Sequence, residues 1–247
     1  MNYRSTDSIR ALLKVLPLAI THAEIMARVQ VLLAQGSGGY YIALNPEKIM
    51  HAIASQDVCQ LLLQAHFVYA DGIGVAIASK LLQQKNIERV TGADLLLDVA
   101  ALCEKEKKTI ALYGASKDNI AKALQALQVA YPKLNIAFAV DGYQNDSGYI
   151  TQLMQSTPPD LVFVGLGSPK QEQWIIEQVN RFPQTLFTGV GGSFDVLSGA
   201  VTRAPQWIRR IGMEWLYRIV SQPLQRYKRI KPLMLYGVRV LKERWKR

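Results

Sequence analysis

The stretch of residues 161–179, LVFVGLGSPKQEQWIIEQV, carries the pattern that decides the fold. It begins with an apolar run typical of a buried strand, continues through a glycine turn, and ends in a pattern typical of a helix. The turn holds several hydrogen-bonding side chains, among them Ser168, Lys170 and Gln171. Because open α/β sheets bind ligands at the carboxyl ends of their strands, we expect this turn to be a binding loop.

The same succession of strand, turn and helix recurs along the chain. Expected strands occupy residues 39–45, 65–72, 109–116, 135–143, 160–168 and 185–193; expected helices begin at Pro46 and cover residues 91–108, 117–130, 146–156 and 169–181. Strands that alternate with helices at this spacing predict βαβ units. The sequence therefore predicts an α/β fold with a Rossmann-like, mostly parallel sheet and flanking helices.

Positive charge is concentrated at the C-terminal end. Residues 1–200 contain 16 Lys and Arg against 17 Asp and Glu, whereas residues 201–247 contain 13 against 2. The chain of 247 residues is long enough for a substantial core, and its 49% apolar content excludes a disordered protein. We expect an α/β core over residues 1–200 and a basic helical appendage over residues 201–247.

This appendage mixes Arg and Lys with Trp, Tyr, Leu and Ile at helical intervals. Such a helix suits the headgroup layer of an anionic membrane. Nucleic-acid binding and helix pairing in a homo-oligomer are the alternatives, although no known nucleic-acid module is recognisable. We expect no transmembrane helix, because about 18 apolar residues nowhere run together, and no signal peptide, because no small-residue cleavage site follows a sustained apolar core near the N-terminus. The protein is expected to be cytoplasmic, peripheral on the inner face of the plasma membrane, without nucleic acid as a partner.

The sequence also argues against a metal site. Cys59 and Cys103 form no CxxC motif, and His22, His51 and His66 lack the spacing of metal ligands. We expect reduced thiols and neither a metal nor a cofactor.

The motif YADGIGV places Asp71 between an expected strand and a glycine turn. A carboxylate at this edge of the sheet could act as a general base or bind sugar hydroxyls. The alternative is that Asp71 only caps the following helix.

Two further turns are rich in candidate binding groups. In GVGGSFD (189–195), Gly191 and Gly192 expose backbone N–H groups to an anion, but the spacing is not GxGxxG and no helix clearly opens after it. In GSPKQE, Lys170 could meet phosphate and Gln171 a sugar or pyrophosphate oxygen. The structural alternative there is a helix with Ser168 as N-cap and Pro169 as its first residue.

Taken together, these motifs resemble the WecG/TagA/CpsF glycosyltransferase family from about residue 40 to residue 229. The resemblance is carried by an ordered set: LNPEK, YADGIGV, RVTGADLL, DGY, VGLGSPKQE, GVGGSFDVLSGAVTRAP and EWLYR. It implies a bacterial, membrane-associated enzyme that moves an N-acetylmannosamine-type sugar from a UDP donor to polyprenyl-diphosphate-linked N-acetylglucosamine. It also implies transfer with inversion and without a metal.

The resemblance assigns roles to residues at the core of the motifs. Asp71 corresponds to the proposed catalytic base, which deprotonates the acceptor hydroxyl. Asn45 and Arg89 match positions near the donor and acceptor, and Gln171 matches a glutamine that contacts donor sugar or phosphate.

Further roles follow for substrate binding. Tyr143 is expected to stack on uracil and Asp195 to hold the ribose hydroxyls. Arg218 resembles an arginine that reaches from the appendage toward the diphosphate, with help from Arg226 and Arg229.

One departure from the family concerns donor choice. Some members have TLN where this chain has ALN, so that Ala43 replaces a threonine hydroxyl. The stretches ALN, VDGY and EWLYRIVSQP favour the branch that transfers N-acetylmannosaminuronic acid for enterobacterial common antigen. The alternatives are N-acetylmannosaminyl transfer of the wall teichoic acid or capsule type, and a non-catalytic UDP-binding regulatory protein.

Overall fold

The computed structural model describes residues 7–143, 147–221 and 223–245, without the side chains of Ser147, Arg210, Arg218 and residues 223–229. The chain divides into two compact units. Unit 1 contains Met1–His22, Ala43–Thr91 and Arg203–Arg247, and unit 2 contains Ala23–Ile42 and Gly92–Thr202.

The six strands form one sheet in the order β2-β1-β6-β5-β3-β4, and every described strand pairing is parallel. Each of the six expected apolar runs contains one strand, which confirms the predicted α/β class. The strands are β1 (Gly39–Leu44), β2 (Phe67–Ala70), β3 (Thr109–Gly114), β4 (Asn135–Val140), β5 (Leu161–Gly165) and β6 (Leu186–Gly189). All residues of β1, β2 and β6 are buried, which explains why they form continuous apolar runs rather than alternating ones.

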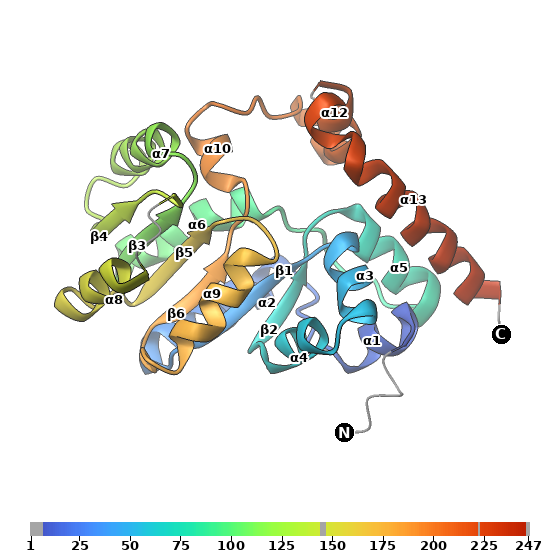
Figure 1. The fold of residues 1–247 in the computed structure, drawn as a ribbon, viewed down its shortest axis with the longest axis horizontal. Helices are drawn as coiled ribbons and strands as arrows, with labels where there is room; N and C mark the ends of the chain where they lie inside the picture. The colour runs from blue at the N-terminus through green and yellow to red at the C-terminus, as the bar shows by residue number, and fades with distance from the viewer. Residues whose placement is uncertain (1–6, 144–146, 222, 246–247) are drawn as a thin grey trace. The chain divides into compact units, whose positions relative to one another are not determined.

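In unit 2, helices pack on strands β3 to β6 (Figure 1). Close approach of two strands requires glycine at position 114, because a Cβ there would lie 2.4 Å from the carbonyl of Gly165 on the neighbouring strand. The helices are α6 (Gly92–Lys105), α7 (Lys117–Ala130), α8 (Ser147–Ser156), α9 (Lys170–Val179) and α10 (Ser193–Leu197), together with α2 (His22–Gln35), which begins at the unit boundary.

Two details at the turns of unit 2 differ from expectation, and helix α2 (His22–Gln35) was not expected. A helix does open after the glycine turn, because α10 begins at Ser193, but its five residues are too few to show a helical period in the sequence. The predicted cap of α9 is also wrong: Pro169, not Ser168, is the N-cap, and no side chain caps this helix. The loop before α9 is therefore one residue longer than predicted.

Unit 1 is organised by the long C-terminal helix, which runs along α3 and α5 (Figure 1). Tyr236 and Val240 are its buried contacts, at 3% and 4% exposure. Its Glu243 carboxylate accepts hydrogen bonds from the backbone N–H groups of Ile9 (3.0 Å) and Arg10 (2.9 Å) at the start of α1. The helices are α1 (Ile9–Val15), α3 (Pro46–Ala54), α4 (Gln56–Gln64), α5 (Ile73–Gln83), α11 (Gln206–Arg210), α12 (Glu214–Ser221) and α13 (Pro223–Trp245).

Candidate active site

In unit 1, Asp71 lies directly after β2. Its backbone N–H donates to the Leu44 carbonyl at 2.9 Å, so it sits beside the end of β1, and its side chain is half-buried. Gly72 takes a positive φ of 97° and is the N-cap of α5, which has no side-chain cap. Asp71 is therefore not the N-cap residue of this helix. Its side chain lies at the carboxyl end of β2.

Asn45 occupies the turn after β1. It is the N-cap of α3, and its Oδ1 accepts a hydrogen bond from the Lys48 N–H at 2.9 Å. Pro46 opens the helix as predicted. The cap uses the carbonyl oxygen of the Asn45 side chain, which leaves its amide nitrogen as the group that can donate to a ligand.

Lys48 is a buried support of this turn that the sequence analysis missed. It is 5% exposed, and its Nζ donates to the Ala43 carbonyl at 2.8 Å. A lysine in the first turn of a helix opposes the helix dipole, and that unfavourable position is the signal that could have identified it. Lys48 ties the end of β1 to α3.

Arg89 lies beside the same strand ends, because its neighbour Val90 donates its N–H to the Ala70 carbonyl at 3.0 Å. Its guanidinium is committed to the C-terminal segment: Nη1 donates to the Arg209 carbonyl at 2.6 Å, and Nη2 lies 3.3 Å from the Glu214 carboxylate. Glu214 is buried at 8% exposure. Arg89 therefore holds the start of α12 in unit 1, and its charge is balanced by Glu214.

The C-terminal helix also contacts the turn that follows Asp71. The Tyr236 hydroxyl donates to the Gly74 carbonyl at 3.2 Å, and a Cβ on Gly74 would lie 2.8 Å from the Pro46 side chain. Burial raises the pKa of Tyr236 well above its usual range, so the hydroxyl stays protonated as a donor. Helix α13 thus fixes the turn between Asp71 and α5.

In unit 2, Gln171 is a buried support for the glycine turn. It is 2% exposed; its Oε1 accepts from the Gly191 N–H at 3.1 Å, and its Nε2 donates to Glu172 Oε1 at 2.8 Å. A Cβ on Gly189 would lie 2.4 Å from Nε2, so glycine is required there. Both polar atoms of the Gln171 amide are thus used within the protein. The Gly191 N–H, which was expected to face an anion, donates to Gln171 instead.

Asp195 lies in the first turn of α10. Its Oδ1 accepts a hydrogen bond from Asn119 Nδ2 at 2.7 Å, and its side chain is half-buried. Asn119, on α7, is a second residue that the sequence analysis missed, because contact between α7 and α10 arises only in the folded chain. Gly192 directly precedes α10 and is its N-cap.

The remaining candidates are exposed or lie outside the described side chains. Tyr143, after β4, is 75% exposed, and its N–H donates to Asp141 Oδ1 at 2.9 Å, which holds a tight turn. Lys170, the first residue of α9, is exposed. Helices α12 and α13 include the positions of Arg218, Arg226 and Arg229, whose side chains lie outside the described residues.

Within residues 7–143, 147–221 and 223–245, no group of three or more His, Cys, Asp and Glu side chains could hold a metal ion. In the same described ranges, no helix combines the length and apolar character needed to cross a membrane.

Comparison with known proteins adds a family and several relatives. Residues 11–247 match the glycosyl transferase WecG/TagA/CpsF family. A protein of Bacillus subtilis named N-acetylglucosaminyldiphosphoundecaprenol N-acetyl-beta-D-mannosaminyltransferase is 38% identical over 85% of this chain and 81% of its own length. A protein of the same name from Bacillus spizizenii is 36% identical over 85% of the chain and 81% of its own length. A protein of the same name from Staphylococcus aureus is 32% identical over 84% of the chain and 81% of its own length.

Proposed function

The chain belongs to the WecG/TagA/CpsF glycosyl transferase family, and on this basis we propose that it transfers an N-acetylmannosamine-type sugar from UDP to polyprenyl-diphosphate-linked N-acetylglucosamine. The single observation that carries this proposal is the position of Asp71, a half-buried carboxylate directly after strand β2. The names of the relatives supply the acceptor and the sugar. A purely regulatory UDP-binding protein does not fit a glycosyltransferase family.

The reaction is a single displacement with inversion. The acceptor hydroxyl oxygen attacks the anomeric carbon, its proton passes to Asp71, and the bond from that carbon to the UDP oxygen breaks. General-base assistance of this kind contributes about 10²–10⁴-fold to the rate. Asn45, one residue beyond β1 in the same unit, donates through Nδ2 to a substrate oxygen.

Negative charge develops on the departing diphosphate. We assign its stabilisation to Lys170, Arg218, Arg226 and Arg229, aided by backbone N–H groups of the turn that contains Gly192. Gln171 contributes indirectly, because its amide holds Gly191. Arg89 contributes indirectly as well, since its guanidinium holds the start of α12.

The donor nucleotide is assigned to residues of unit 2. Tyr143 presents an exposed ring for the base, and Asp195 presents a carboxylate for the ribose hydroxyls. Both follow strands of the parallel sheet, where nucleotides bind in such folds.

Two donor sugars are each favoured by a different observation. The relatives are named as N-acetylmannosaminyltransferases, which favours UDP-N-acetylmannosamine. Ala43, in place of the threonine of some members, and the stretch EWLYRIVSQP favour the uronic acid and enterobacterial common antigen. A uronate needs a cation, and exposed Lys170 is the candidate that the structure describes, because Arg89 is already paired with Glu214.

The test is UDP release by the purified full-length protein in the presence of EDTA, with a short-chain polyprenyl-diphosphate-N-acetylglucosamine as acceptor. Release with UDP-N-acetylmannosamine, or with the uronic acid donor, would identify the sugar directly. Release must require the acceptor. No release with either donor, in EDTA or with added Mg²⁺, contradicts the proposed reaction.

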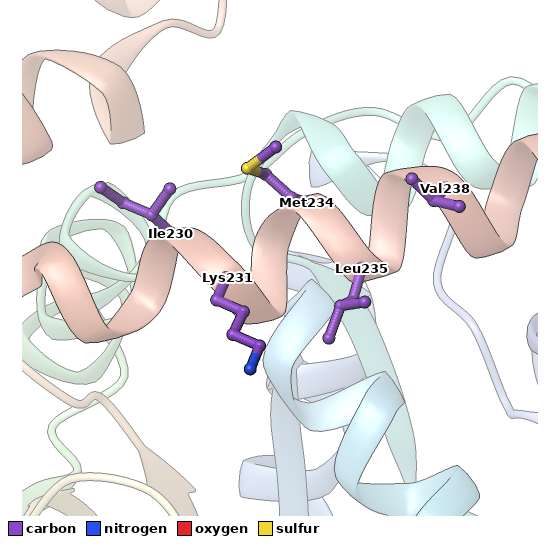
Figure 2. A pocket seen from close by; sticks show the side chains of 5 residues that line it. All are labelled: Ile230, Lys231, Met234, Leu235 and Val238. Atoms are coloured by element: carbon purple, nitrogen blue, oxygen red, sulfur yellow. The ribbon is translucent and has the colours of Figure 1, made fainter.

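Membrane attachment is assigned to the C-terminal segment. Of the 18 large apolar side chains that are exposed in the described residues, 11 lie between Trp207 and Trp245. Figure 2 shows one group on α13: Ile230, Lys231, Met234, Leu235 and Val238. Apolar side chains beside Lys and Arg match the interface of an anionic membrane, where the lipid-linked acceptor resides. The protein then acts on the cytoplasmic face without spanning the bilayer.

Flotation with vesicles of anionic phospholipid tests this attachment. Met234→Glu should lower the bound fraction, because Met234 is 67% exposed on the apolar group. Val129→Glu is the matched control, since Val129 is an apolar residue of 76% exposure on α7. Equal binding of both variants would remove α13 as the membrane contact.

A further inference from the structure

Asn119 lies in the first turn of α7, in unit 2, and the proposed reaction gives it no role so far. Its backbone N–H donates to the N-cap Ser116 Oγ at 3.3 Å. A polar side chain at this third helical position often turns back to the N-cap backbone. The Asn119 side chain instead reaches α10, where Nδ2 donates to Asp195 Oδ1 at 2.7 Å.

This hydrogen bond determines which oxygen of Asp195 can meet a ligand. An ionised carboxylate is purely an acceptor, and Asn119 occupies Oδ1. The other oxygen, Oδ2, lies on the side of Gly192, 3.6 Å from the position that a Cβ of that glycine would take. Within the part of the chain that the structure describes, no hydrogen bond to Oδ2 is formed.

We propose that Asn119 is a positioning residue that orients the Asp195 carboxylate, so that Oδ2 accepts a hydrogen bond from a ribose hydroxyl of the UDP donor. This inference rests on the proposed function. Asp195 follows the glycine turn at the carboxyl end of β6, and an acidic side chain that accepts from ribose is a recurrent feature of α/β nucleotide sites. The pair therefore makes the site selective for a ribonucleotide.

The chemistry requires a donor at position 119. Aspartate there would bring two carboxylates together, and leucine would leave Oδ1 without its donor. Asparagine also has a short side chain on a capped helix, so little conformational entropy is lost when it holds Asp195.

The experiment compares nucleotide affinities of the full-length protein by titration calorimetry, with UDP and 2′,3′-dideoxy-UDP as the two probes. We expect the unsubstituted protein to prefer UDP by about tenfold or more, the size of one good hydrogen bond to a charged group. Asn119→Leu should abolish most of this preference by weakening UDP binding while affinity for the dideoxy nucleotide stays the same.

Two further variants keep the result interpretable. Asn119→Ser is a milder change that should also lower the preference for UDP. It serves as the test if the leucine variant fails to fold. Asp118→Asn, at the exposed neighbouring position of α7, is the matched control and should retain the full preference.

The outcomes separate the inference from the proposed function. Equal weakening of both nucleotides by Asn119→Leu indicates a structural role only and overturns the inference. An unchanged preference for UDP overturns it as well. If the unsubstituted protein binds no UDP, the proposed donor itself is wrong, and the inference is overturned with it.

Discussion

In unit 1, the turn after β2 leaves Asp71 half-buried, with the helix start capped by Gly72 instead. In unit 2, the turn after β5 leads to Gln171, which is 2% exposed and has both amide atoms in hydrogen bonds. Both segments have the same pattern of apolar strand, glycine turn and helix. Their polar residues nevertheless differ: Gln171 supports a backbone turn, whereas Asp71 is the residue that we propose as the general base.

The difference follows from what surrounds each side chain. Gly189 lacks the Cβ that would collide with Gln171, so the amide packs against β6 and reaches the Gly191 N–H. At Asp71, the backbone N–H donates to the Leu44 carbonyl at the neighbouring strand end. The missing Cβ of Gly189 therefore allows the Gln171 amide to serve as an internal support.

Asp71→Asn tests the chemical side of this comparison and should have the largest effect. Loss of the general base should lower kcat by about 10²–10⁴-fold, while the dissociation constant for UDP stays unchanged. Steady-state UDP release and titration calorimetry measure the two quantities. Asp57→Asn, an exposed position on α4, is the control. Full activity of the Asp71 variant would remove it as the base.

Gln171→Leu tests the supporting side. The Gly191 N–H loses its acceptor and Glu172 loses its donor, so the free energy of unfolding should fall by about 2–4 kcal/mol. Urea denaturation measures it, and Gln173→Leu, at an exposed position of the same helix, should have little effect. If Gln171→Leu is as stable as the unsubstituted protein but does not bind UDP, Gln171 contacts the ligand and the comparison fails.

Gly189→Ala tests whether the missing Cβ of Gly189 is what allows the Gln171 amide to pack against β6. The new methyl group would lie 2.4 Å from Gln171 Nε2 and displace the amide, at a cost of about 1–3 kcal/mol in stability. Gly237→Ala is the opposite case, because it lies in α13 with no atom within 4 Å of the added Cβ. It should raise stability by about 0.5–1 kcal/mol, since alanine is the better helix former. Thermal unfolding measures both changes in stability. If both variants are destabilised, or both are stabilised, the explanation from the missing Cβ is wrong.

Tyr236→Phe should have a small effect, about 0.5–1.5 kcal/mol for the lost hydrogen bond to the Gly74 carbonyl. The pH dependence has a definite sign. Burial raises the Tyr236 pKa in the folded state, so above a pH of about 10 the unfolded tyrosine ionises first and stability falls. The phenylalanine variant should lose less stability than the unsubstituted protein between neutral and alkaline pH, measured by urea denaturation. An identical alkaline loss would contradict burial of this hydroxyl.

Sequence pattern was sufficient to predict the sheet, because strands buried on both faces are continuous apolar runs. It also predicted helices α6, α7, α8 and α9 of unit 2, because helices of ten or more residues can show a helical period. It failed at α10, which has five residues, and at the start of α9, where Pro169 rather than Ser168 is the cap. Asp71 and Gln171 were recognisable as candidates because turns at strand ends concentrate polar groups, and Asp195 was assigned through the family resemblance. Lys48 and Asn119 were not, since neither stands in a turn.

The sequence by itself determined the fold class, the family, the charge asymmetry and the set of turns that carry candidate residues, because these depend on local pattern and composition. Tertiary structure alone decided the use of each polar group. It paired Arg89 with Glu214, 125 positions away, and Asn119 with Asp195, 76 positions away. Hydrogen bonds between such distant residues depend on how helices pack, and local sequence pattern contains no information on that packing.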